Sequence, residues 1–426
     1  MKIHFLKKSW IPILVLVAFL IAFPNQIISK TNKTLQKAQI QQSSSGDQTT
    51  QGSLRCDALS AVLMDELTGQ VLYEQNSRLR ISPASFVKVM TLYLVYDAIR
   101  AGQLKMDDLV TVSENAWRRA WKTDASKMFI KVGERVKVED LMKGVAIASG
   151  NDACVALAEH LSGSEEVFVS KMNEKARHLG LTDTQFRNSD GMPADGQYIT
   201  ALDMANLTRY YIEDHPEALT LHSTVDFEYN GIRQGNRNIL LQRNIGVDGL
   251  KTGHVKESGY HLTATAKRDG QRMITVVMGC DKMKKRAPEA QKLLEYGFRN
   301  FSTVEAVKKG ASFGPVKVRR GKLNQVILTA VEYGRVTVAK GKENSVSVLP
   351  QLPPFLTAPV QKGQVVAKVL IQNEGKVVKE VNLSSSSDIL KSFFPPWPIT
   401  AAGITGIVLI VIAGFWWFRR PKRRRF

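Results

Sequence analysis

The sequence predicts a mixed α/β (α+β) domain, followed by a small all-β sandwich domain and a C-terminal transmembrane helix. Strand patterns at both ends of residues 56–302 enclose a helical middle, which indicates an antiparallel sheet completed by the last strands. In residues 303–384, short β-type runs alternate with Gly and Pro turns, as in a β-sandwich. Residues 398–418 carry no charge and would measure about 32 Å as a helix, enough to cross a bilayer.

Residues 1–30 have the layout of a secretory signal. An apolar run from Trp10 to Phe23 follows three lysines, and no acidic residue precedes Asp47. Because no small-x-small cleavage site follows the run, an uncleaved signal anchor stays open beside a cleaved signal peptide. Residues 31–55 are rich in Gln and Ser and are expected to form a flexible linker.

The C-terminal end predicts how the chain meets the membrane. Residues 385–397 form a Ser- and Pro-containing linker, and residues 419–426 form a basic tail after the apolar stretch. The positive-inside rule places this tail in the cytoplasm. We therefore expect the chain in the cytoplasmic membrane, with its folded domains on the periplasmic or cell-wall side.

The charge balance does not indicate nucleic-acid binding. The chain has 59 Lys and Arg against 39 Asp and Glu, a formal net charge of +20. Nine of these positive charges lie at the two ends, in Lys2, Lys7, Lys8 and the basic tail. The rest fits attraction to anionic lipid or to a polyanionic cell wall, and no nucleic-acid partner is expected.

Periodicity and turn signals place the elements of the first domain. Strands are expected at 58–63 and 70–73, joined by a hairpin turn at 65–69. The expected helices, the fourth capped by Thr200, are 138–148, 152–161, 164–179, 200–213 and 286–298. Further strands are expected at 239–242, 249–252, 260–268 and 272–279. In the second domain the expected strands are 316–319, 325–330, 335–338, 345–349, 364–371 and 376–383.

A serine and a lysine lie one turn apart at the start of an apolar helix. Pro83 is expected at the first helical position behind a Ser82 cap, and the apolar run 86–99 predicts a buried helix. The spacing puts Ser85 and Lys88 on one face, as a nucleophile and its base. Burial and a second nearby cation would help Lys88 to lose its proton. A lone S-x-x-K would more often be a helix cap and a surface lysine.

Two further motifs favour the catalytic interpretation. Ser149-Gly150-Asn151 is expected at a turn between helices, and Lys251-Thr252-Gly253-His254 at the end of a strand. Ser149 can relay a proton, while Asn151 can hold Lys88 and donate an amide hydrogen bond to the substrate. The cation of Lys251 would attract a substrate carboxylate, Thr252 would add a hydroxyl, and Gly253 would let the ligand approach the strand.

The backbone amides of Ser85 and His254 are expected to form an oxyanion hole. No metal site is expected, because His254 and His261 lack a carboxylate placed to complete one. Alone, the second and third motifs would be a plain turn and a strand end. Together with S-x-x-K they are a known signature of penicillin-binding proteins and class A β-lactamases.

The chain resembles the low-molecular-mass penicillin-binding proteins, which are serine-type D-alanyl-D-alanine carboxypeptidases. Besides the three motifs, the segments 126–129, 149–159 and Gly259-Tyr260 carry the resemblance, which covers residues 56–300, and residues 303–383 resemble the family's C-terminal β domain. The resemblance implies a penicillin-binding/β-lactamase-like transpeptidase domain. It makes Ser85 the acyl-ester nucleophile, Lys88 the proton acceptor, Ser149 the second catalytic serine and Lys251 a substrate-binding residue. Arg286 resembles the arginine that holds the terminal carboxylate.

The resemblance implies removal of the terminal D-alanine from peptidoglycan stem pentapeptides, with β-lactams as covalent inhibitors and no cofactor. Two alternatives stay open. A β-lactamase of the same fold would need a carboxylate that activates the deacylating water, and no convincing E-x-x-L-N segment lies between Asn151 and Lys251. A penicillin-binding scaffold without hydrolytic activity would not need the complete set of motifs. Family members are often held by an amphipathic helix, whereas this chain carries an apolar stretch long enough to span the membrane.

Overall fold

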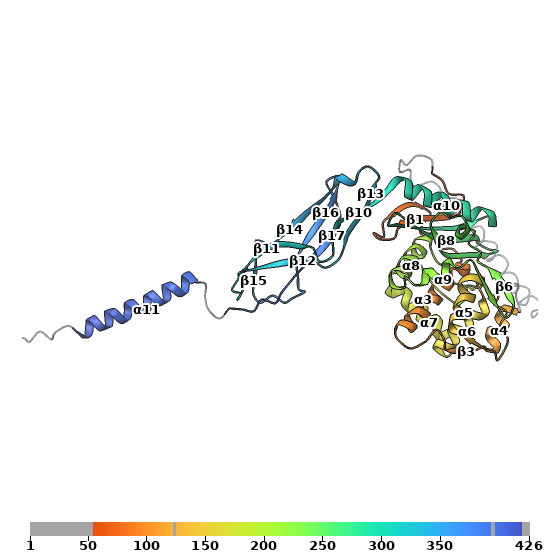
Figure 1. Ribbon diagram of the computed structural model, residues 1–426, viewed down its shortest axis with the longest axis horizontal. Helices are drawn as coiled ribbons and strands as arrows, with labels where there is room; N and C mark the ends of the chain where they lie inside the picture. The colour runs from red at the N-terminus through yellow and green to blue at the C-terminus, as the bar shows by residue number, and fades with distance from the viewer. Residues whose placement is uncertain (1–53, 122–124, 393–396, 420–426) are drawn as a thin grey trace, which may run out of the picture. The chain divides into compact units, whose positions relative to one another are not determined.

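The computed structural model describes residues 54–121, 125–392 and 397–419 (Figure 1). The expected signal segment, nearly all of the following linker and the basic tail beyond Arg419 lie outside the described residues.

A five-stranded antiparallel sheet forms the centre of the first domain, in the order β2-β1-β9-β8-β7. Its strands are β1 (Ser60–Asp65), β2 (Val71–Gln75), β7 (Val247–Val255), β8 (Gly259–Arg268) and β9 (Gln271–Cys280). The first strand pairs with the last, with Ser60 opposite Met278. The expectation that late strands complete the sheet begun by early ones is confirmed.

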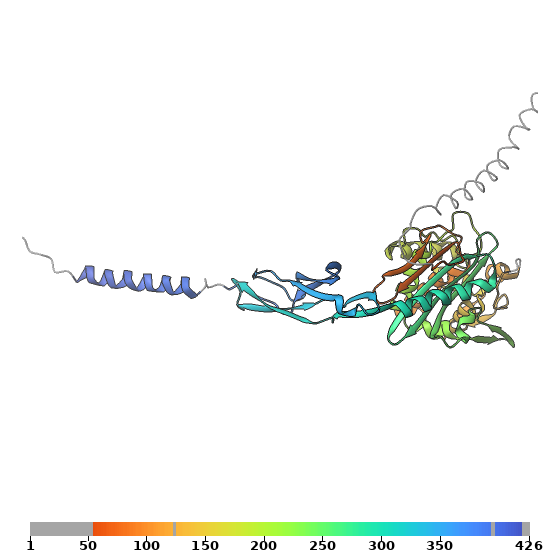
Figure 2. The ribbon, with the colours of Figure 1, turned by 90° about the horizontal axis from the view of Figure 1, so that it is seen from above.

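Helices cover both faces of this sheet. The long helix α10 (Met283–Asn300) packs on β8 and β9 from one side, and α8 (Ala201–Asp214) packs on β9 and β1 from the other. Figure 2 shows α10 crossing the strands. Helix α9 (Ala218–Ser223) packs on β7. The other helices of this domain are α3 (Val87–Arg100), α4 (Glu114–Trp121), α5 (Val138–Lys143), α6 (Asn151–Ser162) and α7 (Glu165–His178).

Helix α3 runs through the core of the helical part. Its side chains from Val87 to Tyr93 are all buried, since they pack against neighbours on every side. A helix with apolar residues on nearly every face has no surface to turn to water, so the prediction of a buried helix is confirmed.

Two local predictions were wrong, and a third was confirmed. Ser82 does not cap a helix, because a 3₁₀ turn (η2, Ala84–Phe86) precedes α3 without a side-chain cap. Residues Ile239–Gln242 form a 3₁₀ turn (η4) instead of a strand, since the side chain of Asn238 accepts a hydrogen bond from the Leu240 amide and starts the turn. The Lys-Thr-Gly motif lies at the end of the edge strand β7, as expected, and the strand ends one residue after His254, at Val255.

The second domain consists of two β-sheets. One pairs β10 (Phe301–Val307) with β13 (Gly334–Ala339). The other has the order β14-β16-β17-β12-β11-β15. Its strands are β11 (Ser312–Arg319), β12 (Gln325–Ala330), β14 (Val346–Gln351), β15 (Phe355–Thr357), β16 (Val365–Asn373) and β17 (Lys376–Ser385). Both sheets contribute to one apolar core, in which Val307 and Val336 lie with Ile371.

The remaining short elements are β3 (Leu109–Thr111), β4 (Arg135–Lys137), β5 (Asp226–Tyr229), β6 (Ile232–Gly235), a π turn η3 (Gly144–Ala148) and a 3₁₀ turn η5 (Glu343–Ser345). The last helix, α11 (Trp397–Phe418), exposes apolar side chains such as Ile410 and Trp416. Within the described ranges, no helix has both the length and the apolar character needed to cross a membrane. The transmembrane helix therefore stays a prediction.

Candidate active site

The three sequence motifs meet at one cleft of about 990 Å³. Ser85 comes from the 3₁₀ turn before α3, Asn151 from the first residue of α6, and Thr252 from the edge strand β7. These elements are far apart in sequence, so the sheet and the helical part must both be folded before the cleft exists. Ser149, Gly253, His254 and Arg286 also line it.

Lys88 is fully buried and has three hydrogen-bond acceptors around its amine. The Nζ atom lies 3.2 Å from Ser85 Oγ and 2.8 Å from Asn151 Oδ1. It also donates to the backbone carbonyl of Asp190. The expected pair of nucleophile and base is thus within hydrogen-bond reach, as proton transfer requires.

Ser149 connects Lys251 to the nucleophile. Its Oγ donates to Ser85 Oγ at 3.1 Å and accepts from Lys251 Nζ at 3.0 Å. The backbone of Ser149 has φ +62°, and that of Ala84, next to the nucleophile, has φ +49°. Both values are unusual for residues with a Cβ, and such strain is commonly found at functional sites.

Lys251 is almost completely buried beside other cations. Burial lowers its pKa well below the usual value, and the charges of Lys88 and Arg237 lower it further. A lysine whose pKa is lowered in this way gives up a proton more readily than an exposed lysine, which suits the hydrogen bond of Lys251 with Ser149.

A second group of cations faces the cleft along β7. Arg286 Nη1 donates to the carbonyl of Gly253 at 3.3 Å, and burial, with the nearby charge of Arg237, lowers the pKa of Arg286 to about 10. Arg237 lines the same wall, although no motif in the sequence marks it. The ring of His254 stacks on Tyr260 with centroids 4.1 Å apart. This wall can bind a carboxylate.

Strand β7 passes very close to the turn that carries Ser85. A Cβ added at Gly253 would lie 3.2 Å from the Cβ of Ala84 and 3.4 Å from the carbonyl of Pro83. Only a residue without a side chain fits this contact comfortably. Ser85 and His254 both line the cleft, and the role of their amides as an oxyanion hole stays a prediction.

The sequence did not identify the loop 188–193 as part of the site. It was expected only as a turn, yet its carbonyl at Asp190 accepts from Lys88, and Met192 and Pro193 line the cleft. Contacts made by a backbone carbonyl leave no signature in side-chain identity, so no motif could have located it.

His261 supports the site from behind and gives it an expected acid sensitivity. Its Nδ1 accepts from the amide of Gly279 at 2.9 Å, so this nitrogen must be unprotonated in the folded chain. Burial lowers the pKa of His261 to about 4, compared with an unfolded value of about 6.5. Between these values the unfolded chain binds a proton that the folded chain does not, so stability falls as the pH falls through this window.

We therefore expect His261 to make the chain about 2 kcal/mol less stable at pH 5 than at pH 7. Urea unfolding at both pH values, in the full chain and in His261→Gln, measures this. The variant should lose less stability than the wild type on acidification, and an equal loss in the two proteins would contradict the assignment.

Comparison with known proteins gives a consistent result along both domains. A family model described as D-alanyl-D-alanine carboxypeptidase matches residues 47–282, and one described as the C-terminal domain of penicillin-binding protein 5 matches residues 301–391. The chain is 43% identical to the D-alanyl-D-alanine carboxypeptidase DacC of Escherichia coli over 76% of this chain and 82% of the relative. It is 38% identical to DacF of Bacillus subtilis over 79% and 87%.

Solved structures give the same picture. Penicillin-binding protein 5 from Haemophilus influenzae has a TM-score of 0.76 at 40% identity, covering 80% of this chain and all of that protein. Penicillin-binding protein D2 from Listeria monocytogenes, in its ampicillin-bound form, has a TM-score of 0.53 at 32% identity, covering 58% of this chain and all of that protein.

Proposed function

This chain belongs to the D-alanyl-D-alanine carboxypeptidase family. We propose the role of each residue in the reaction and the side of the membrane on which the reaction takes place. It is a serine-type D-Ala-D-Ala carboxypeptidase that binds β-lactams. Its substrate is the peptide part of peptidoglycan, from whose pentapeptide stems it removes the terminal D-alanine. The hydrogen-bonded chain from Lys251 through Ser149 and Ser85 to Lys88 is the observation that supports the mechanism.

In the acylation step, neutral Lys88 takes the proton of Ser85 Oγ while this oxygen attacks the carbonyl carbon of the penultimate D-alanine. The 3.2 Å distance between the two groups allows the transfer. Ser149 passes a proton to the departing amine of the terminal D-alanine, and Lys251 can supply the proton to Ser149. The products are an ester on Ser85 and free D-alanine.

Before deacylation, Lys88 releases to solvent the proton that it took from Ser85, and Lys251 takes one up from solvent. In the deacylation step, a water molecule attacks the ester carbonyl and gives its proton to the neutral amine of Lys88. The proton then returns to Ser85 Oγ as the ester bond breaks, which restores the starting state. The amides of Ser85 and His254 stabilise the negative oxygen in both steps. Asn151 keeps Lys88 in place through its 2.8 Å contact and turns its amide toward the substrate.

The terminal carboxylate of the substrate binds along β7. Lys251 and Arg286 provide positive charge there, and Thr252 provides a hydroxyl beside them. The requirement for a free carboxylate explains why the enzyme acts on the last residue of a peptide. The experiment that tests the proposal is release of D-alanine from a D-Ala-D-Ala-terminated peptide by the wild type and by a Ser85 variant.

The C-terminal helix α11 is proposed to anchor the protein in the cytoplasmic membrane, with both folded domains outside the cytoplasm. The support is the charge-free sequence from Pro398 to Phe418, the exposed apolar side chains of the helix and the basic residues that follow it.

The full chain should therefore stay with the membrane fraction during alkaline carbonate extraction. A chain ending at Lys391 should move to the soluble fraction if the N-terminal segment has been cleaved. Extraction of the full chain by carbonate would contradict the anchor. Retention of the shortened chain would assign the anchoring to the N-terminal segment instead.

A further inference from the structure

The loop 188–193 is tied to helix α3 by two consecutive backbone carbonyls. Thr91 Oγ1 donates to the carbonyl of Ser189 at 2.6 Å, and Lys88 Nζ donates to the carbonyl of Asp190. Thr91 and Lys88 lie one helical turn apart, so they present their donors to the loop from the same face of α3. The position of the loop backbone therefore decides where one acceptor of the Lys88 amine lies.

The same loop packs on the turn that carries the nucleophile. Gly191 has φ +85°, and a Cβ added there would lie 1.9 Å from the carbonyl oxygen of Ala84. The backbone of the loop thus touches the residue directly before Ser85. A shift of the loop would therefore displace both the nucleophile and its base.

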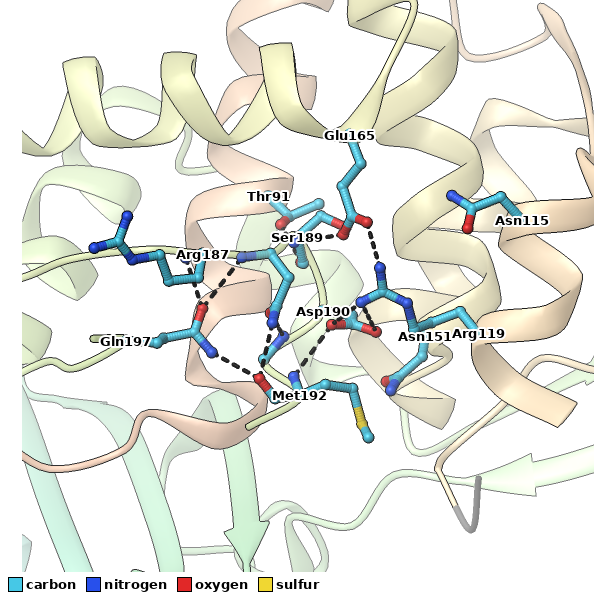
Figure 3. Close-up of polar contacts among 12 residues, drawn as sticks. Thr91, Asn115, Arg119, Asn151, Glu165, Arg187, Ser189, Asp190, Met192 and Gln197 are labelled. Atoms are coloured by element: carbon cyan, nitrogen blue, oxygen red, sulfur yellow. Dashed lines mark hydrogen bonds and ion pairs between the residues drawn. The ribbon is translucent and has the colours of Figure 1, made fainter. Parts of the chain in front are cut away.

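An ion network that reaches the cleft at Asp190 holds this loop (Figure 3). Arg119, on helix α4, lies 3.3 and 3.4 Å from the two carboxylate oxygens of Asp190 and also pairs with Glu165, the first residue of α7. Glu165 Oε1 in turn accepts from the amide and the hydroxyl of Ser189, at 2.9 and 2.7 Å. One arginine therefore joins two helices to the two residues whose carbonyls face α3.

The two carboxylates of this network are buried, so the arginine that pairs with both of them stabilises their position. The carboxylate of Asp190 is fully buried, and the side chain of Glu165 is only 9% exposed. Two buried carboxylates on neighbouring segments repel each other, and a cation shared between them offsets this repulsion. Arg119 supplies that charge and is not among the described residues that line the cleft.

The orientation of Lys88 explains what the network contributes to catalysis. A neutral amine has two N–H groups and one lone pair. With Asn151 Oδ1 and the carbonyl of Asp190 accepting the two N–H groups, the lone pair points at the third neighbour, Ser85 Oγ. If the Asp190 carbonyl moves away, the amine can rotate and the lone pair loses this direction.

We propose that Arg119, through its ion pairs with Asp190 and Glu165, is a positioning residue that holds the Asp190 carbonyl where it aims the Lys88 amine at Ser85. The proposal rests on the proposed function, in which Lys88 is the base. It assigns to Arg119 an effect on the rate of acylation and none on the initial binding of the ligand.

Stopped-flow acylation of the purified full chain by a fluorescent penicillin tests this, because it separates the binding constant from the limiting acylation rate. In Arg119→Gln the limiting rate should fall about 10- to 100-fold, the effect of a displacement of roughly 1 Å at a reacting group, while the binding constant stays within about twofold. Arg119→Lys keeps the charge and should lose less of the rate than Arg119→Gln does.

Arg268→Gln is the matched control. Arg268 is 28% exposed, compared with 25% for Arg119, and it pairs with Glu295 at 2.7 Å, away from the cleft. The acylation rate of Arg268→Gln should equal that of the wild type.

A folded Arg119→Gln with the wild-type acylation rate would overturn the proposal, and so would equal losses in Arg119→Gln and Arg268→Gln. If Arg119→Gln does not fold, Asp190→Asn replaces it, and an unchanged rate in that variant would overturn the proposal. Failure of the wild type to be acylated at all would instead contradict the proposed function.

Discussion

Replacing Ser85 with alanine should abolish the release of D-alanine from a D-Ala-D-Ala-terminated peptide. The hydroxyl that forms the ester is lost, and removing the nucleophile of a serine hydrolase costs up to about 10⁶-fold in kcat. The remaining contacts of Lys88, to Asn151 and to the Asp190 carbonyl, do not involve this hydroxyl, so the fold should persist. D-alanine release by the full chain, together with a thermal unfolding curve, measures both expectations.

Ser170→Ala is the control for this experiment. Ser170 lies on α7, and its hydroxyl bonds only to the backbone of its own helix, at Glu166, among the contacts that the described structure gives it. This variant should release D-alanine at the wild-type rate. A folded Ser85→Ala that retains more than about a hundredth of the activity would show that another group is the nucleophile.

The wild type in the same assay separates the alternative functions. Labelling by penicillin without any release of D-alanine would indicate the non-hydrolytic scaffold. Rapid turnover of penicillin would indicate a β-lactamase. A stable penicillin adduct together with release of D-alanine is the expected outcome.

Replacing Lys88 with methionine should slow acylation by penicillin about 10²- to 10⁴-fold, the usual contribution of a general base. Methionine has a similar length and fits a fully buried site, but it cannot accept the proton of Ser85. The acceptors at Asn151 and Asp190 would lose their donor, which costs about 1–3 kcal/mol for each group left unsatisfied. Fluorescent-penicillin labelling over time, with urea unfolding beside it, measures both effects.

Lys175→Met controls for the loss of a lysine that is partly buried and paired. Lys175 is 19% exposed and pairs with Asp97 at 2.9 Å on the far side of α3, outside the cleft. The variant Lys175→Met should be less stable than the wild type and should keep the wild-type acylation rate. If Lys88→Met were acylated within about tenfold of the wild type, another residue would have to be the base.

The proposed role of Arg119 adds a structural condition to this mechanism. Lys88 needs burial and directed neighbours at the same time, and helix α3 alone can provide only the burial. The directed neighbours come from α6 through Asn151 and from the loop 188–193 through Asp190. A base in this site thus depends on residues as far away as Arg119 in α4 and Glu165 in α7.

The local pairing of catalytic groups could be predicted from the order of the residues alone. Ser85 and Lys88 could be paired from their spacing, since one helical turn brings positions three apart together whatever the rest of the fold does. The spacing of apolar residues likewise predicted α3, α6 and the strands β8 and β9. Apolar residues recur at a characteristic spacing along a buried helix or strand, and this spacing is visible in the sequence.

Features that depend on contacts between distant segments could be seen only in the folded chain. The 3₁₀ turn before α3 packs against β7 and against the loop at Gly191, and no local pattern contains these neighbours. The Asp190 carbonyl, Arg237 and the network of Arg119 are held by residues up to 102 positions away. Hydrogen bonds to backbone carbonyls and ion pairs across elements form only when the chain is folded, and they therefore leave no motif in the sequence.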